Sequence, residues 1–148
     1  MVRIVPNLVT ERIESVKAGL VGASAFATAE LIAILFQATA VKAILQYNLT
    51  PIVLDGELLL QLSFGAVSGF LFGVTYRYII RNDRNSHLND GAVFAFGLIR
   101  GLALVENNLI WSKPIFLLSL VIKSIIYFAI ARFTLDLAIA RKLIKPFM

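Results

Sequence analysis

The chain has 148 residues, 59% of them hydrophobic, and a mean hydropathy of +0.84, which exceeds the apolar content of an ordinary soluble domain. It has no cysteine and one histidine, which excludes disulfides, thiolate catalysis and metal sites built from cysteines or several histidines. The net charge of +5 does not indicate nucleic-acid binding, because the basic residues flank long apolar segments and form no recognised binding motif. These properties predict an all-α integral membrane protein with one transmembrane domain over residues 1–148.

Four apolar segments are predicted to form a bundle of transmembrane helices, over residues 17–42, 57–80, 91–111 and 114–136. The first segment is long enough to cross a hydrocarbon core of about 30 Å at about 1.5 Å per residue. An earlier start of this helix, with Thr10 as the N-cap residue, is also compatible with the sequence. Pro114 is expected at the first helical position of the fourth segment, where its missing N–H group costs no hydrogen bond.

The third segment is the hardest to assign. Its apolar part, from Gly91 to Val105, contains Arg100 and would be only about 22 Å long as a helix. Extension through Glu106 to Trp111 makes it long enough to span the membrane. A re-entrant segment is the alternative.

The basic residues predict that both chain ends lie in the cytoplasm. If all four segments span, only Lys42 and Lys113 lie on the opposite side. The side of the chain ends has ten basic residues, namely Arg3, Arg12, Lys17, Arg77, Arg81, Arg84, Arg132, Arg141, Lys142 and Lys145. This asymmetry follows the positive-inside rule and also counts against a re-entrant third segment.

Three ionisable residues, Glu30, Arg100 and Lys123, lie inside the apolar segments and are predicted near the middle of the bilayer. A single charge there costs roughly 2.5–3.5 kcal/mol on insertion scales, so three at similar depth are expected to be neighbours. Ser119 and Tyr127 lie four residues before and after Lys123, which predicts a polar stripe on one face of the fourth helix.

One carboxylate faces two cations in this predicted cluster, so positive charge is in excess. Either Lys123 is neutral, or an anionic ligand, a lipid or a partner residue balances it. Three interpretations remain: a buried ion-pair network that fixes helix packing, a ligand or ion site, and a contact with a charge of another subunit.

Small residues at four-residue spacing predict close helix packing of the glycine-zipper type. The second segment has Gly65, Gly69 and Gly73 at this spacing, and the third has Gly97 and Gly101. The first segment has a comparable face that ends in Glu30, formed by Gly19, Ala23 and Ala27. The neighbouring helix belongs either to the same chain or, in a homo-oligomer or larger complex, to another one.

The loop between the second and third segments is basic, with Arg77, Arg81, Arg84 and His87. These side chains are expected to reach anionic lipid headgroups. A docking surface for a cytoplasmic partner is the alternative.

Catalytic patterns are nearly absent. The chain has neither HExxH nor GxSxG. The run from Ala66 to Gly69 partly resembles the serine segment of rhomboid proteases, but the leading glycine is missing and His87 is not on a facing helix. We therefore predict that the protein is not an enzyme.

The stretch YRYIIRNDRNSHLNDGAVFAFGLIRGLALVE, from Tyr76 to Glu106, resembles small membrane proteins of cyanobacteria and plastids that have no assigned function. The resemblance covers about a fifth of the chain. It implies a thylakoid or cyanobacterial inner membrane and a place beside photosynthetic or respiratory complexes, and it supplies no catalytic residues. The ExxNxR pattern of light-harvesting proteins is not found around Glu30 or Glu106.

The function predicted from these features is that of a non-enzymatic accessory or assembly subunit of a membrane complex. The small size, the glycine faces and the short extramembrane segments favour it. The alternative is a small oligomeric transporter or channel in which Glu30, Arg100 and Lys123 line a polar site. The expected partners are membrane lipids and other membrane subunits or further copies of the chain. The sequence leaves a bound lipid or pigment open.

Overall fold

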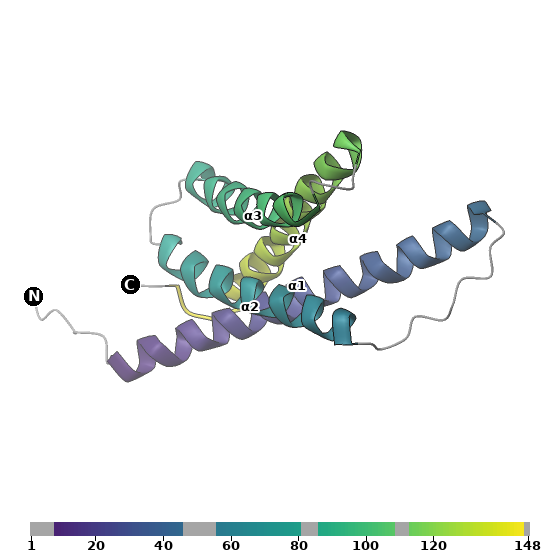
Figure 1. The fold of residues 1–148 in the computed structure, drawn as a ribbon. Helices are drawn as coiled ribbons and strands as arrows, with labels where there is room; N and C mark the ends of the chain where they lie inside the picture. The colour runs from purple at the N-terminus through teal and green to yellow at the C-terminus, as the bar shows by residue number, and fades with distance from the viewer. Residues whose placement is uncertain (1–7, 46–55, 81–85, 109–112, 147–148) are drawn as a thin grey trace, which may run out of the picture.

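The computed structural model describes residues 8–45, 56–80, 86–108 and 113–146, and these form four helices without any strand (Figure 1). The helices are α1 (Leu8–Leu45), α2 (Gly56–Ile79), α3 (Ser86–Asn108) and α4 (Pro114–Ala140). Each contains a stretch that is long and apolar enough to cross a membrane. The predicted all-α fold and the four candidate spans are confirmed at this level.

The helix bounds agree best with prediction at α2, where each end differs by one residue. α1 begins at Leu8 and has 38 residues, so it is about 57 Å long, well beyond the thickness of a hydrocarbon core. Thr10 therefore lies inside the helix, and its assignment as N-cap is wrong. Pro114 lies in the first turn of α4 with Lys113 as N-cap, as expected, and the helix continues four residues past the predicted end to Ala140.

α3 is longer than predicted at its start, and at its other end it includes residues 106–108 of the predicted extension. It is a single helix of 23 residues, about 35 Å long, that begins at Ser86 rather than at Gly91. Its first turns include Asp90, which forms an ion pair with Arg132 of α4 and so ties this extension to the rest of the protein. The predicted end at Trp111 lies outside the described residues.

Glycines bring α1 and α2 into backbone contact where the two helices cross (Figure 1). A Cβ atom placed on Gly69 would lie 2.6 Å from both the Gly22 carbonyl oxygen and the Phe26 Cβ atom. A Cβ atom on Gly73 would collide with the Ala18 carbonyl oxygen. Only glycine permits this approach. Gly22, which the sequence analysis did not single out, is the α1 member of this contact.

The glycines of α3 pack within the chain as well. A Cβ atom on Gly97 would lie 2.8 Å from the Ile125 Cα atom, and one on Gly101 would lie 2.8 Å from the Val121 Cα atom. The four helices therefore form two close pairs, α1 with α2 and α3 with α4. α1 and α4 also pack against each other, whereas α2 touches α3 and α4 much less.

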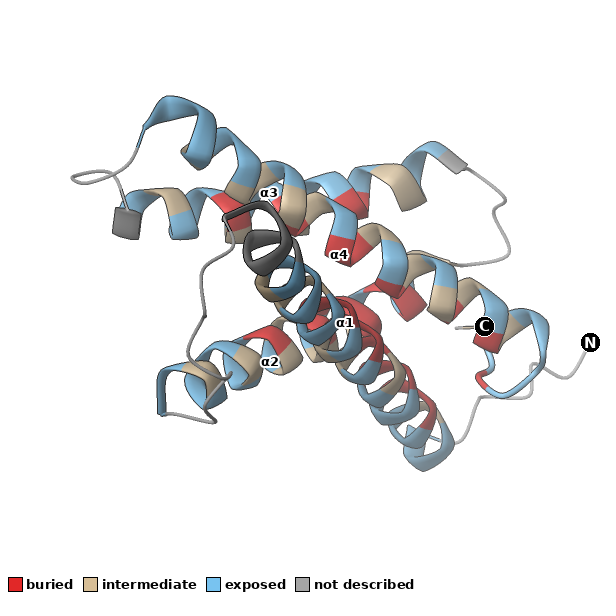
Figure 2. Cartoon of the chain, turned by 90° about the vertical axis from the view of Figure 1, so that its right-hand side faces the viewer, coloured by how far each residue is buried: buried red, intermediate tan, exposed pale blue. Residues whose placement is uncertain are grey.

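One phenylalanine from each helix meets in an aromatic cluster at the centre of the fold. Phe26 and Phe128 have ring centroids 4.9 Å apart, and Phe72 lies 5.2 Å from Phe128. Phe96 adds the fourth ring, 5.4 Å from Phe72. Figure 2 shows the buried residues gathered where the helices cross. The tilted and edge-on ring geometries are those that aromatic pairs prefer.

The outer surface has more large exposed apolar side chains than is usual for a water-soluble protein. Leucine, isoleucine, valine and phenylalanine side chains are exposed on all four helices. The last part of α1 extends away from the other helices (Figure 1). These surfaces are consistent with an integral membrane protein whose helices face lipid.

Candidate functional site

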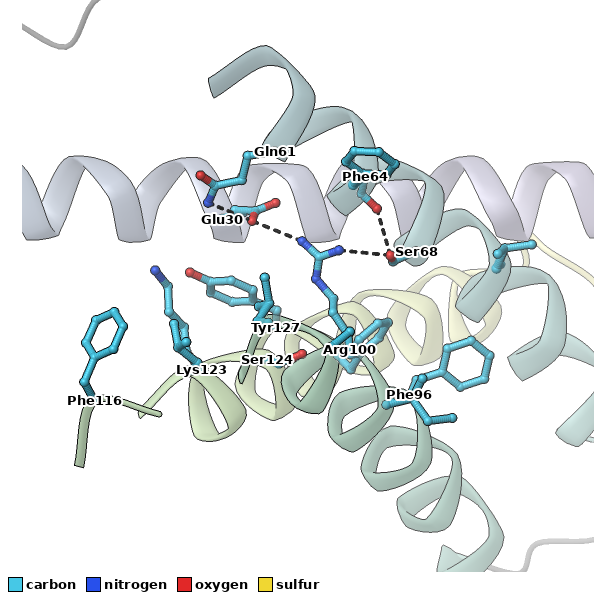
Figure 3. A pocket seen from close by; sticks show the side chains of 16 residues that line it. Glu30, Gln61, Phe64, Ser68, Phe96, Arg100, Phe116, Lys123, Ser124 and Tyr127 are labelled. Carbon is cyan, nitrogen blue, oxygen red and sulfur yellow. Dashed lines mark hydrogen bonds and ion pairs between the residues drawn. The ribbon is translucent and has the colours of Figure 1, made fainter. Parts of the chain in front are cut away.

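A cavity of about 760 Å³ lies among the four helices, a size typical of small-molecule sites (Figure 3). α1 contributes Glu30 alone, and the rest of the lining comes from α2, α3 and α4. Most of the lining side chains are apolar. The polar ones are Glu30, Gln61, Ser68, Arg100, Lys123, Ser124 and Tyr127.

An ion pair between Glu30 of α1 and Arg100 of α3 lies at the polar side of this cavity. The Arg100 Nη2 atom is 3.3 Å from the Glu30 Oε1 atom, and the Gln61 side-chain amide donates to the same oxygen at 3.2 Å. Arg100 Nη1 donates to the Ser68 hydroxyl at 3.1 Å. Two residues that are seventy positions apart in the chain are thus brought together, with α2 supplying the polar groups between them.

Gly65 makes room for the Glu30 carboxylate, because a Cβ atom at this position would collide with the Glu30 Oε2 atom. The glycine face of α2 therefore serves two purposes, close helix contact at Gly69 and space for a buried acid at Gly65. On the other side of the pair, the Arg100 guanidinium lies over the Phe26 ring at 4.9 Å from its centroid. This cation–π contact holds the guanidinium against α1.

Lys123 is placed differently from Arg100. Its ammonium donates to the Gln37 side-chain oxygen at 3.1 Å and lies 5.8 Å from the centroid of the Tyr127 ring. Among the described residues, the ion pairs do not include Lys123. The structure brings it to the same cavity as Glu30 and Arg100 without pairing it to a carboxylate.

The predicted stripe of Ser119, Lys123 and Tyr127 is only partly present. Ser119 is exposed and donates to the Phe116 carbonyl oxygen of its own helix, and it does not line the cavity. A step of four residues rotates the side chain by about 40° relative to the previous one, so a stripe of three drifts by about 80°. Ser124, one residue beyond Lys123, faces the cavity instead.

Three buried polar atoms of the lining have no hydrogen-bond partner among the described residues: Glu30 Oε2, Ser124 Oγ and the Tyr127 hydroxyl oxygen. The three residues are only 3%, 1% and 6% exposed. Buried polar groups are normally paired, because an unpaired one costs free energy. Figure 3 shows the Lys123 ammonium and the Tyr127 hydroxyl directed to the same side of the cavity as Glu30. The arrangement is suited to a polar group bound between α1 and α4.

The predicted docking surface is contradicted at Arg77. Arg77 is only 1% exposed, which contradicts its assignment to that surface. The reason is that the last turn of α2 packs against the first turns of α1. His87 lies exposed on the first turn of α3, whereas Arg81 and Arg84 lie outside the described residues.

Arg77 instead organises a second polar cluster that sequence reasoning missed. It donates to the Ser15 hydroxyl at 2.7 Å, to the Glu11 carbonyl oxygen at 3.1 Å and to the Lys145 carbonyl oxygen at 2.9 Å, and it pairs with the Glu11 carboxylate. Glu14 accepts a hydrogen bond from the Lys145 backbone N–H group at 2.9 Å. Residues 141–146 are thereby held against α1 and α2. The signal available in the sequence was the opposite charge of Glu11 and Arg77 at the same predicted membrane surface.

This cluster defines one end of the molecule, which we call the basic end. It contains the start of α1, the end of α2, the start of α3 and the end of α4, joined further by the hydrogen bond from Tyr76 to Asp136 at 2.8 Å. The cavity lies toward the opposite end. Gln61 is about 8 Å from the start of α2, Arg100 about 12 Å from the end of α3, and Lys123 about 14 Å from the start of α4.

Among the described residues, no group of three or more histidine, cysteine, aspartate or glutamate side chains could hold a metal ion. The chain matches no protein-family model, no curated protein and no solved structure. The resemblance of residues 76–106 therefore stays a prediction, and the functional argument rests on the geometry of the cavity.

Proposed function

We propose that the protein binds an anionic ligand within the membrane at the cavity formed by Glu30, Arg100 and Lys123, and that it works as a small oligomeric transporter of that ligand. The observation that supports this is Lys123, which has no carboxylate partner among the described residues and lies in the same cavity as the buried hydroxyls of Ser124 and Tyr127. The sequence alone favours an accessory subunit. The cavity favours transport, because helix packing alone requires no such space.

The charge balance of the cavity favours an anionic ligand. Glu30 and Arg100 neutralise each other, so Lys123 leaves the site with one net positive charge. An uncompensated charge inside a bilayer is expensive. A bound anion offsets this cost and accepts hydrogen bonds from the Lys123 ammonium and the Tyr127 hydroxyl.

The arrangement of the helices in two pairs favours transport. The cavity lies between the α1–α2 pair and the α3–α4 pair, and α1 and α4 provide most of the contact between them. Two rings of the aromatic cluster, Phe96 and Phe128, form part of the cavity wall. We propose that a relative movement of the two pairs opens the site to alternate sides, as in other transporters built from rigid helix units.

The orientation and the membrane are part of the proposal. We propose that the basic end faces the cytoplasm, because of the ten-to-two distribution of basic residues, in a cyanobacterial inner or thylakoid membrane. Cytoplasm-specific and exterior-specific reporters fused after Arg84 and after the C-terminus test the orientation. An exterior signal from either fusion contradicts it.

Flux measurements on the purified protein test the function. Liposomes that contain only this protein are expected to move an anionic probe, with inorganic phosphate and a short alkyl phosphate as the first two candidates, and Lys123→Met is expected to abolish that movement. The matched control is Lys113→Met, which removes the same charge at an exposed position outside the cavity. If the wild type moves neither these probes nor an anionic lipid, or if Lys123→Met behaves as the control does, the proposal is wrong.

The accessory subunit remains a second candidate because of the last part of α1. Leu31, Ile32, Leu35 and Phe36 are all exposed there, on the stretch of α1 between Glu30 and Gln37. A helix of another subunit would cover this surface. Co-migration with a larger complex in mild detergent, lost when Ile32 and Phe36 are replaced by serine, supports this candidate.

A further inference from the structure

We propose that the ligand is a membrane amphiphile with one anionic headgroup, which enters the cavity sideways from the bilayer between α2 and α3. This inference rests on the proposed function, since it names the ligand class of the same cavity. It differs from the binding of a water-borne anion in two respects, the direction of entry and the need for an apolar tail.

The rim of the cavity is open on the lipid-facing surface. Phe64 and Leu71 of α2 and Ile99 of α3 line the cavity and yet are 66%, 53% and 71% exposed. A side chain that is both lining and mostly exposed lies at an opening. α2 and α3 pack against each other far less than the helices of the two close pairs do. The gap between them therefore connects the cavity to the region that acyl chains occupy.

The lining combines a few polar side chains with a larger number of apolar ones. Lys123 and Tyr127 of α4 offer an ammonium and a hydroxyl donor on the same side of the cavity, and Ser124 of α4 adds a second hydroxyl to the lining (Figure 3). The remaining wall is mostly aliphatic and aromatic, and includes Phe64, Leu71, Phe96, Ile99, Leu104 and Leu120. A small hydrated anion would lose its water without replacement along this wall, whereas an alkyl chain contacts it at no polar cost.

The net charge of the site indicates the charge of the headgroup, and the depth of the site indicates its leaflet. One positive charge remains after Glu30 pairs with Arg100, so a headgroup with a single negative charge neutralises the site. Lys123 lies about 14 Å from the start of α4, and a lysine side chain can extend toward the nearer membrane surface. The geometry therefore places the headgroup in the leaflet opposite the basic end. A phosphodiester and a carboxylate share the required oxyanion chemistry.

Native mass spectrometry of the delipidated protein in neutral detergent tests the inference with three probes: phosphatidylglycerol, phosphatidylcholine and inorganic phosphate. We expect phosphatidylglycerol to bind best, and Lys123→Met to weaken it about ten-fold or more. Lys113→Met is the charge control. Ala103→Trp fills part of the cavity and is expected to reduce binding, whereas Ala95→Trp, on an exposed part of α3 outside the cavity, is expected to leave it unchanged.

A measurement on the wild-type protein removes any dependence on variant folding. Phosphatidylglycerol with a photoreactive acyl chain is expected to label peptides that contain residues 96–104 or 116–128. Labelling confined to other surfaces overturns the inference. Lys123-dependent binding of inorganic phosphate at least as tight as that of phosphatidylglycerol overturns the lipid ligand but leaves anion binding intact. Equal binding of both phospholipids, unaffected by Lys123→Met, together with no binding of phosphate, overturns both proposals.

Discussion

Arg77 and Arg100 are both arginines within apolar helices, yet they have opposite surroundings. Arg77 is enclosed at the basic end and uses all three of its nitrogen atoms in hydrogen bonds to Glu11, Ser15 and Lys145. Arg100 pairs with Glu30 and Ser68 at the wall of a cavity, beside three polar atoms that have no partner among the described residues. In the first cluster the donors and acceptors are matched, whereas the second contains buried polar atoms without a hydrogen-bond partner among the described residues.

The difference separates a structural cluster from a binding site by its hydrogen bonds rather than by its charges. A matched buried network fixes packing and becomes costly when one member is removed. In a cluster with unpaired polar atoms around a cavity, the free-energy cost of leaving those atoms unpaired is already present in the folded protein. Removal of one such atom therefore lowers stability little. Substitutions at the basic end are therefore expected to affect stability, and those at the cavity to affect ligand binding more.

The largest effect on stability is expected for Arg77→Met. It leaves the Glu11 carboxylate and the Lys145 carbonyl oxygen without their shared donor, and breaking a buried pair costs about 3–5 kcal/mol in soluble proteins. Reversible unfolding in mixed detergent micelles measures the loss. The control is Arg12→Met, because Arg12 is an exposed arginine at the same basic end of the molecule. Equal stability of the two variants would show that the basic end does not depend on Arg77.

Gly69→Leu is expected to come next, with a loss of about 1–3 kcal/mol from overpacking. The added side chain would start 2.6 Å from the Gly22 carbonyl oxygen, and backbone atoms cannot yield without separating α1 from α2. Gly91→Leu is the control, because a Cβ atom there meets nothing within 4 Å. Normal yield and unchanged unfolding of Gly69→Leu contradict the close contact.

Glu30→Gln is expected to act on the two properties in opposite directions. Loss of the ion pair with Arg100 lowers stability by about 0.6–1.7 kcal/mol, the range of polar contacts between membrane helices. The site then has two net positive charges, so binding of an anionic lipid becomes tighter. Further replacement of Arg100 and Lys123 by leucine is expected to restore stability in part and to abolish binding. If the single and triple variants both unfold as the wild type does, the pair contributes nothing to stability.

The smallest effect is expected for Ser124→Ala. Its hydroxyl has no partner among the described residues, so its removal is neutral or slightly stabilising in the ligand-free protein. Ser15→Ala makes the comparison, because it removes a hydroxyl that accepts from Arg77, and it is expected to cost about 1 kcal/mol. The same unfolding assay measures both. A loss at Ser124 as large as that at Ser15 contradicts the distinction between the two clusters.

Hydropathy and helical spacing account for the parts of this protein that the sequence determines. A backbone in lipid must satisfy its own hydrogen bonds, so long apolar segments become helices whatever surrounds them. For this reason α2 was predicted to within one residue at each end. The face of α2 that contacts the nearest helix could also be predicted from the sequence, because glycines at four-residue spacing share a face, as Gly69 and Gly73 do against α1.

The tertiary structure decided which polar residues meet. Spacing along one helix does not show that Gln61 and Ser68 of α2 complete the contacts of Glu30 and Arg100, or that Ser119 rotates out while Ser124 rotates in. It also does not show that Arg77, predicted as part of a basic loop surface, is buried against α1. These outcomes depend on where the helices cross, and the crossing points depend on pairs of small residues such as Gly22 and Gly69 on different helices. The periodicity of a helix predicts which of its faces is apolar. Only the packing of the helices determines which groups each polar side chain contacts.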